Sequence, residues 1–207
     1  MLEIRSDERP KILDAVDSHG FLTFDGKWDL NLIGLRTPNT EANLFDDFLF
    51  VVCRDSENKW CTWVFRCTTD AGTYWLRNPS RVDGTAILVD PQQCRSAYQL
   101  DLHAGRYLAL CQRKPVKVWR DANRDEILDR YGAEHVGYFG INIHRASQTR
   151  IVNEVERYSA GCTVIQDFDE FDFLLSLCKK QIAVLGYDKF TYTIIKGELS
   201  DFCEEEP

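Results

Sequence analysis

The feature that most constrains the fold is a series of short apolar runs, each bounded by polar or turn-forming residues. The runs begin after Trp28 and occupy residues 30–35, 48–53, 60–67, 85–89, 107–112, 116–119 and 190–195. Several short strands at this spacing are typical of a β-sandwich or of a strongly curved, barrel-like sheet. The polar segment Asp55–Lys59 separates two of the runs and predicts a hairpin turn.

Two other segments carry helical signals. Apolar residues recur at near-helical spacing over residues 9–18, and His19–Gly20 then predicts the end of a short helix. Farther along, acidic residues precede the apolar segment Phe171–Cys178 and Lys179–Lys180 follow it, an order that the helix dipole favours. We therefore predict a mainly β (α+β) fold, a β-sandwich or curved sheet with a few short helices.

Length and composition allow one substantial core. The chain has 207 residues, of which 44% are apolar, and no internal repeat or Pro/Gly-rich linker divides it. We predict an N-terminal helical extension over residues 1–25, a single domain over residues 26–200 and an acidic, solvated tail over residues 201–207.

Charge and hydropathy exclude several partners. The net charge is -8, and phosphate binding needs clustered Lys and Arg, so we expect no nucleic-acid partner. Residues 1–10 contain no apolar core of a signal peptide, and no run approaches the ~20 apolar residues that span a bilayer. We expect a soluble protein, made in the cytoplasm without a signal peptide and without a membrane span.

The cysteine pattern argues against a metal site. None of the eight cysteines forms a Cys-x-x-Cys pair, and we expect the thiols to be reduced. In Cys61–Cys67 alternate residues are Cys or aromatic, which predicts a buried strand face. The segment Asp121–Asp125 begins like a calcium loop but lacks its turn glycine and its bidentate glutamate. We predict neither a metal nor a cofactor.

The strongest functional pattern joins a histidine and a cysteine. Gly140-Ile141-Asn142-Ile143-His144 ends on an imidazole, and Ser159-Ala160-Gly161-Cys162 follows after fourteen residues. A cysteine attacks a carbonyl as thiolate, and its free pKa of roughly 8.5 makes a neighbouring imidazole the usual activator. We expect a hairpin-like return of the chain to bring the two together. A glycine before the cysteine allows backbone N–H groups to approach a developing oxyanion.

Residues 138–165 resemble the signature of the L,D-transpeptidase catalytic domain family, which is a Gly-x-His strand, a loop and Ser/Thr-His-Gly-Cys. The resemblance implies that residues 26–200 have the L,D-transpeptidase fold. It also implies that Cys162 forms a thioester with a peptidoglycan stem peptide and that His144 is the general base, oriented by the carbonyl of Arg145. The Gly161 and Cys162 amides would form the oxyanion hole, beside Ser159 in the same turn.

The chain departs from the family pattern around the cysteine. Ala160 replaces the family's second histidine, and Val164 replaces the usual arginine or asparagine. Arg145 stands where a glycine is common and brings a charge suited to a substrate carboxylate. We predict further substrate contacts in or beside the loop from His144 to Cys162, namely Asn142, Arg150, Arg157 and Tyr158.

The resemblance, together with these residues, implies an enzyme that acts on peptidoglycan stem peptides through a cysteine acyl-enzyme. Hydrolysis, as in a bacteriophage endolysin with endopeptidase or L,D-carboxypeptidase activity, is favoured over transpeptidation because the family's flanking residues are replaced. Such a protein would act on the wall after its release or delivery from the cytoplasm. The alternative is a non-catalytic wall-binding or phage structural module on the same fold.

Overall fold

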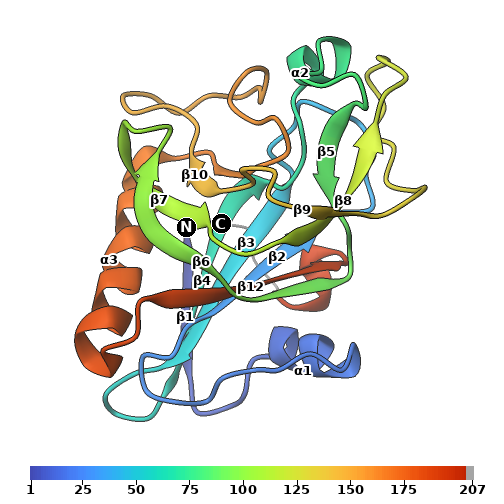
Figure 1. Cartoon of the computed structure of the whole chain (residues 1–207). Coiled ribbons are helices and arrows are strands. Elements are labelled where there is room, and N and C mark those ends of the chain that lie inside the picture. The colour runs from blue at the N-terminus through green and yellow to red at the C-terminus, as the bar shows by residue number, and fades with distance from the viewer. Residues whose placement is uncertain (204–207) are drawn as a thin grey trace.

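The apolar runs form the strands of one large mixed sheet and one small sheet (Figure 1). The structure, a computed structural model, describes residues 1–203. With 38% strand and 17% helix the protein is mainly β, which confirms the predicted fold class. In chain order the strands are β1 (Leu2–Ser6), β2 (Asn31–Arg36), β3 (Asp47–Arg54), β4 (Trp60–Thr68), β5 (Thr85–Leu88), β6 (Gln92–His103), β7 (Tyr107–Gln112), β8 (Val116–Asp121), β9 (His135–Gly137), β10 (Ile143–Arg145), β11 (Thr163–Ile165) and β12 (Lys189–Lys196).

Eight strands of the large sheet pair around a closed ring. The order is β4, β3, β2, β12, β6, β7, β10, β11 and back to β4, and most neighbours are antiparallel. The two parallel pairs are β2 with β12 and β10 with β11. Of the predicted sandwich and curved sheet, the chain forms the curved sheet. The small sheet contains β5, β8 and β9.

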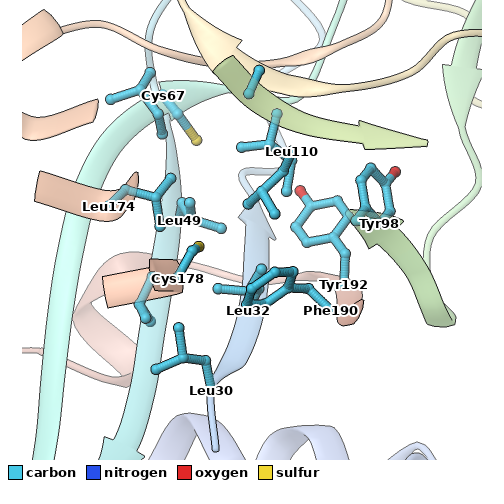
Figure 2. Close-up of a cluster of buried hydrophobic side chains, with 14 of the residues drawn as sticks. Leu30, Leu32, Leu49, Cys67, Tyr98, Leu110, Leu174, Cys178, Phe190 and Tyr192 are labelled. Atoms are coloured by element: carbon cyan, nitrogen blue, oxygen red, sulfur yellow. The ribbon is translucent and has the colours of Figure 1, made fainter. Parts of the chain in front are cut away.

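Alternate residues of the central strands feed two hydrophobic clusters on opposite faces of the sheet. In β3, Leu49, Val51 and Cys53 belong to the larger cluster, whereas Phe48 and Phe50 belong to the second. Both faces of β3 are covered, so the strand reads as a continuous apolar run. The larger cluster also contains every alternate residue of the Cys61–Cys67 segment, as predicted. Figure 2 shows part of this cluster, with Tyr98 and Tyr192 beside Leu110.

Three α-helices lie in the described part of the chain. The first, α1 (Lys11–Ser18), buries Ile12, Leu13 and Val16 in the second cluster and ends at His19, close to the predicted bounds. The short α2 (Thr73–Arg77) was not indicated by the sequence. The third, α3 (Phe168–Leu185), buries one apolar face in the larger cluster, namely Phe171, Leu174, Leu175, Leu177 and Cys178.

The predicted end of α3 is wrong. The helix continues beyond Cys178 to Leu185, so Lys179–Lys180 lie inside it rather than in its last turn. It ends where Gly186 adopts a left-handed conformation with φ of 66°, a conformation that glycine takes without a steric penalty. The stop signal is therefore the glycine and not the lysines.

The N-terminal segment is integrated into the sheet. Residues 2–6 form β1, which pairs antiparallel with β4 from Leu2 opposite Val64 to Ser6 opposite Trp60. At the other end of the chain, Leu199–Asp201 form a 3₁₀ turn and Cys203 is buried. The remainder of the predicted acidic tail, residues 204–207, lies outside the described residues. Within residues 1–203 no helix combines the length and apolarity needed to cross a membrane.

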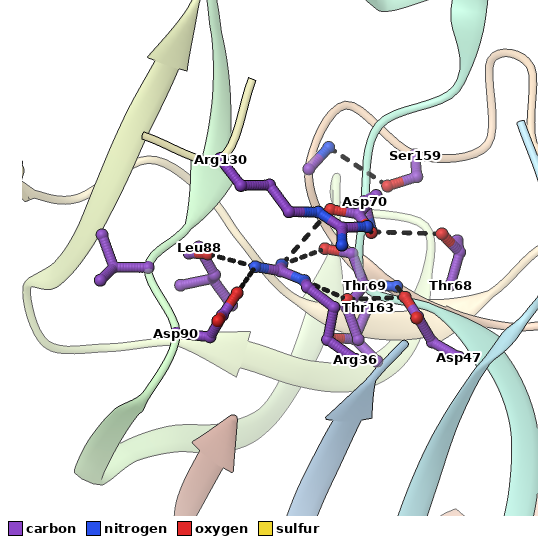
Figure 3. Close-up of polar contacts among 12 residues, drawn as sticks. Arg36, Asp47, Thr68, Thr69, Asp70, Leu88, Asp90, Arg130, Ser159 and Thr163 are labelled. Atoms are coloured by element: carbon purple, nitrogen blue, oxygen red, sulfur yellow. Dashed lines mark hydrogen bonds and ion pairs between the residues drawn. The ribbon is translucent and has the colours of Figure 1, made fainter. Parts of the chain in front are cut away.

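A buried charge cluster holds the end of β4. Arg36 is fully buried and donates to Asp90, to the Leu88 carbonyl and to Thr69, at 2.6 to 3.0 Å (Figure 3). Arg130 donates to Asp70 at 2.6 Å. Directly after Asp70, Ala71 forms a β-bridge with Ala160. The charge cluster therefore fixes the strand that supports the turn before Cys162.

Candidate active site

Strands β10 and β11 bring the two motif segments side by side. Ile143 lies opposite Thr163 and His144 lies opposite Val164 in a parallel pair, and the Thr163 N–H donates to the Asn142 carbonyl at 3.0 Å. Parallel neighbours need a crossover connection, so the expected hairpin-like return is wrong. The loop between the strands instead crosses over, and it returns to place Cys162 beside the start of β10.

The contacts of His144 select one tautomer. Its Nδ1 lies 2.8 Å from the Arg145 carbonyl oxygen and 3.2 Å from the Tyr107 hydroxyl. A carbonyl oxygen only accepts, so Nδ1 carries the proton and Nε2 holds the lone pair. The Tyr107 hydroxyl in turn donates to the Arg145 carbonyl at 3.4 Å. His144 thus presents the unprotonated nitrogen that a general base needs.

Burial keeps His144 neutral. The side chain is 5% exposed, and desolvation, followed by the neighbouring His103, lowers the pKa of His144 to about 3. The charge of Arg145 acts in the same direction, whereas the hydrogen bond to the Arg145 carbonyl opposes it. At neutral pH the imidazole is therefore uncharged, and the lowered pKa makes it a weak base.

Cys162 is equally shielded. Its Sγ lies 3.5 Å from the Gly140 carbonyl oxygen and accepts a hydrogen bond from the Asn142 N–H at 3.4 Å. Burial raises the pKa of the thiol to about 11, although the Asn142 N–H lowers it. Within residues 1–203 no hydrogen bond joins this sulfur to His144. The thiol and the imidazole are both uncharged at neutral pH, and the thiol is directed at the Gly140 carbonyl oxygen.

Ser159 and Gly161 shape the turn that presents Cys162. The buried Ser159 hydroxyl donates to the Cys162 carbonyl at 2.8 Å and accepts from the Gly161 N–H at 3.1 Å. Gly161 has a φ of 108°, and a Cβ there would overlap the Ala86 carbonyl oxygen. Ser159 thus caps the turn, and only glycine fits at position 161.

The same hydrogen bonds change the expected oxyanion hole. The Gly161 N–H is already engaged by Ser159, whereas the Cys162 N–H makes no hydrogen bond within residues 1–203. The Cys162 amide is thus the available donor of the predicted pair. The Asn142 N–H, which already points at the sulfur, is a second donor close to the reacting atom.

The predicted substrate-binding residues lie in two groups. Asn142 and Arg145 lie beside His144, and the Arg145 guanidinium lies 3.9 Å from the centroid of the Tyr107 ring. The others, Arg150, Arg157 and Tyr158, line a hollow in the loop before Cys162. None of the three arginines forms an ion pair within the described chain.

Two residues in contact with His144 or stacked on it were not predicted as site residues. His103 stacks on His144 with ring centroids 4.2 Å apart, and Tyr107 contacts its Nδ1. Both lie at the tip of the β6–β7 hairpin, about forty residues earlier in the chain. No local motif marks them, because only the pairing of β7 with β10 brings them to the site.

Within residues 1–203 no three His, Cys, Asp or Glu side chains gather closely enough to hold an ion. Comparison of the chain with models of known protein families, with curated proteins and with solved structures found no match.

Proposed function

We propose that the protein is a cysteine-dependent acyl-transfer enzyme that acts on peptidoglycan stem peptides, with the chemistry of the L,D-transpeptidase family. One observation carries the proposal. The Nδ1–H of His144 donates to the Arg145 carbonyl oxygen at 2.8 Å, and β11, the strand paired with β10, begins directly after Cys162. This orientation leaves the Nε2 lone pair of His144 without a proton, which is what a general base requires.

In the first half-reaction Nε2 of His144 takes the proton of the Cys162 thiol as the sulfur attacks a peptide carbonyl. A carbon–sulfur bond forms, and the oxyanion receives hydrogen bonds from backbone N–H groups. The intermediate then collapses, the carbon–nitrogen bond breaks, and the leaving amine takes the proton from His144. The product is a thioester on Cys162 and a free amine.

In the second half-reaction water attacks the thioester while His144 accepts a proton from it. The carbon–sulfur bond breaks, the thiolate is reprotonated and a carboxylate is released. An amine in place of water would give a new crosslink. Hydrolysis is favoured because Ala160 and Val164 replace the residues that flank the cysteine in the transpeptidase pattern.

The arginines around the loop suit the substrate. Stem peptides carry carboxylates, and a guanidinium binds a carboxylate through two parallel hydrogen bonds. Arg145 is held over the Tyr107 ring beside His144, and Arg157 lies 4.0 Å from the centroid of the Tyr74 ring. Stacking on an aromatic ring orients each guanidinium while leaving its N–H groups for a ligand.

The experiment is mass spectrometry of defined muropeptides and intact sacculi after incubation with the protein. We expect loss of a terminal residue or of crosslinks with the wild type and none with Cys162→Ala. His144→Ala should lower the rate by roughly 10²–10⁴-fold, as loss of a general base does. Cys94→Ala is the matched control, since Cys94 is also a buried free thiol but lies on β6 away from the site. New crosslinked species instead of cleavage would identify a transpeptidase.

A second candidate function has one observation in its favour. Cys162 packs in an apolar cluster with Phe45, Val155 and Val164, as a structural thiol does. A non-catalytic wall-binding or phage structural module would bind sacculi equally well with and without Cys162→Ala. It would also leave every muropeptide unchanged.

A further inference from the structure

The tip of the β6–β7 hairpin presents a second imidazole to the site. The turn after His103 has positive φ at Ala104 (49°) and Gly105 (70°), and the Arg106 N–H donates to the His103 carbonyl at 3.0 Å. This tight turn holds His103 against the β10 strand. Its ring is nearly parallel to that of His144, with 26° between the planes and 4.2 Å between the centroids.

Asn142 determines the protonation state of His103. The Asn142 Oδ1 accepts from the Gln112 N–H at 2.8 Å, so the amide nitrogen is the atom that faces His103. That nitrogen lies 3.0 Å from Nδ1 of His103 and can only donate. Nδ1 must therefore hold a lone pair, and His103 is the neutral tautomer with its proton on Nε2. A proton on Nδ1 would break this hydrogen bond.

The surrounding charges act in the same direction. Burial and the charge of Arg106, in the same turn, lower the pKa of His103. From β7 the Tyr107 ring lies 5.4 Å away, and from β10 the group that faces His103 is His144 itself. Within residues 1–203 no carboxylate is paired with His103, so a positive charge on it beside an imidazolium at His144 would be strongly unfavourable.

We propose that His103 is a positioning residue for His144. As a neutral ring, His103 fixes the plane of the His144 imidazole and stacks on the imidazolium that forms when Cys162 attacks. A proton on His103 prevents His144 from accepting the Cys162 proton. The inference rests on the proposed function, since it assigns His103 a role only if His144 accepts the Cys162 proton.

The test uses p-nitrophenyl acetate, which acylates a thiol without any peptidoglycan. The Cys162 sulfur bonds to the acetyl carbon, the ester carbon–oxygen bond breaks, nitrophenolate leaves, and His144 takes the thiol proton. We measure the rate from pH 4 to 8 by intact mass and locate the acetyl group by peptide mapping. Cys162→Ala gives the background, and circular dichroism at each pH verifies folding.

Three variants make the pH profile diagnostic. His103→Phe keeps a flat ring that cannot be protonated, so its rate at pH 8 should stay within about threefold of the wild-type rate. The acid limb, which is the fall of the rate at low pH, should shift down by at least about one pH unit. Asn142→Asp provides an acceptor for a proton on Nδ1, so the acid limb should shift up. His103→Ala removes the ring, and we expect at least about a tenfold loss at every pH, as for other misplaced catalytic groups.

The outcomes separate the two proposals. If His144→Ala acetylates Cys162 as fast as the wild type, the proposed function fails. If His144→Ala is slow but the acid limb is unmoved in both His103→Phe and Asn142→Asp, the role of His103 is overturned and the proposed function stands. A general loss of folding in His103→Ala leaves the other two variants to decide.

Discussion

At the level of single residues, the turn before Cys162 shows how backbone conformation and space act together. Gly161 has a φ of 108°, which non-glycine residues rarely adopt, and the Ala86 carbonyl occupies the space that a side chain would need. Ser159 then ties both sides of the turn with its hydroxyl. The position of Cys162 therefore depends on the residues of the turn that precedes it.

Gly161→Ala should destabilise the protein more than a glycine replacement at an open position. Gly132 is the matched control because its φ is 103° but nothing lies near its missing Cβ. Gly132→Ala should cost about 1–3 kcal/mol of unfolding free energy from backbone strain alone. Gly161→Ala should cost that amount plus the free energy needed to displace the turn or β5. Urea denaturation measures both, and equal losses would contradict the crowding argument.

At the level of elements, α3 begins directly after β11 and so secures one strand of the site. Asp167 caps the helix by accepting from the N–H groups of Asp169 and Glu170, at 2.8 and 3.4 Å. Capping satisfies N–H groups that have no partner inside the helix. The cap thereby fixes the direction in which the chain leaves β11.

Asp167→Ala should lower the unfolding free energy by about 1 kcal/mol, the usual cost of losing an N-cap. Asp167→Asn keeps the side-chain acceptor and should lose only a few tenths of a kcal/mol by the same principle. Both values come from urea denaturation. A loss in Asp167→Asn as large as in Asp167→Ala would mean that charge rather than capping matters.

The sequence was sufficient to predict the strands with strong apolar runs, but not every element. β6 reads Gln92–His103 with many polar residues, and its partners β7 and β12 rather than its own hydropathy make it a strand. In the candidate site, a local motif singled out His144 and Cys162, and the structure pairs the strands that carry or follow them. His103 and Tyr107 were not singled out, because their proximity to His144 depends on strand pairing between distant segments.

At the level of the whole molecule, a buried charge cluster joins β2, β3, β4 and the segment after β5. It places Arg36 and Arg130 among three carboxylates, those of Asp47, Asp70 and Asp90. Asp47 accepts from Thr37 and Thr69 and is fully buried. Burial, together with the charge of Asp70, raises the pKa of Asp47 to about 7.

This shift predicts how stability depends on pH. The folded state binds the Asp47 proton more tightly than the unfolded chain, whose Asp pKa is about 3.9. The Asp47 contribution is therefore present below pH ~4 and is lost as the pH rises towards 7, by up to about 1.4 kcal/mol per pH unit. We expect the unfolding free energy of the wild type minus that of Asp47→Asn to be larger at pH 5 than at pH 8. A difference that grows with pH would contradict this.

The ring of strands is joined at its shortest members. β10 meets β7 only at Ile143 opposite Leu110, and β11 meets β4 at Val164 opposite Thr68 and Ile165 opposite Cys67, whereas β3 and β4 pair along their full length. Strand pairs held by so few hydrogen bonds open locally at a lower free-energy cost than long pairs do. We expect these short strand pairs to open more readily than the others, and such opening would expose His144 and Cys162, two side chains that the closed molecule almost covers.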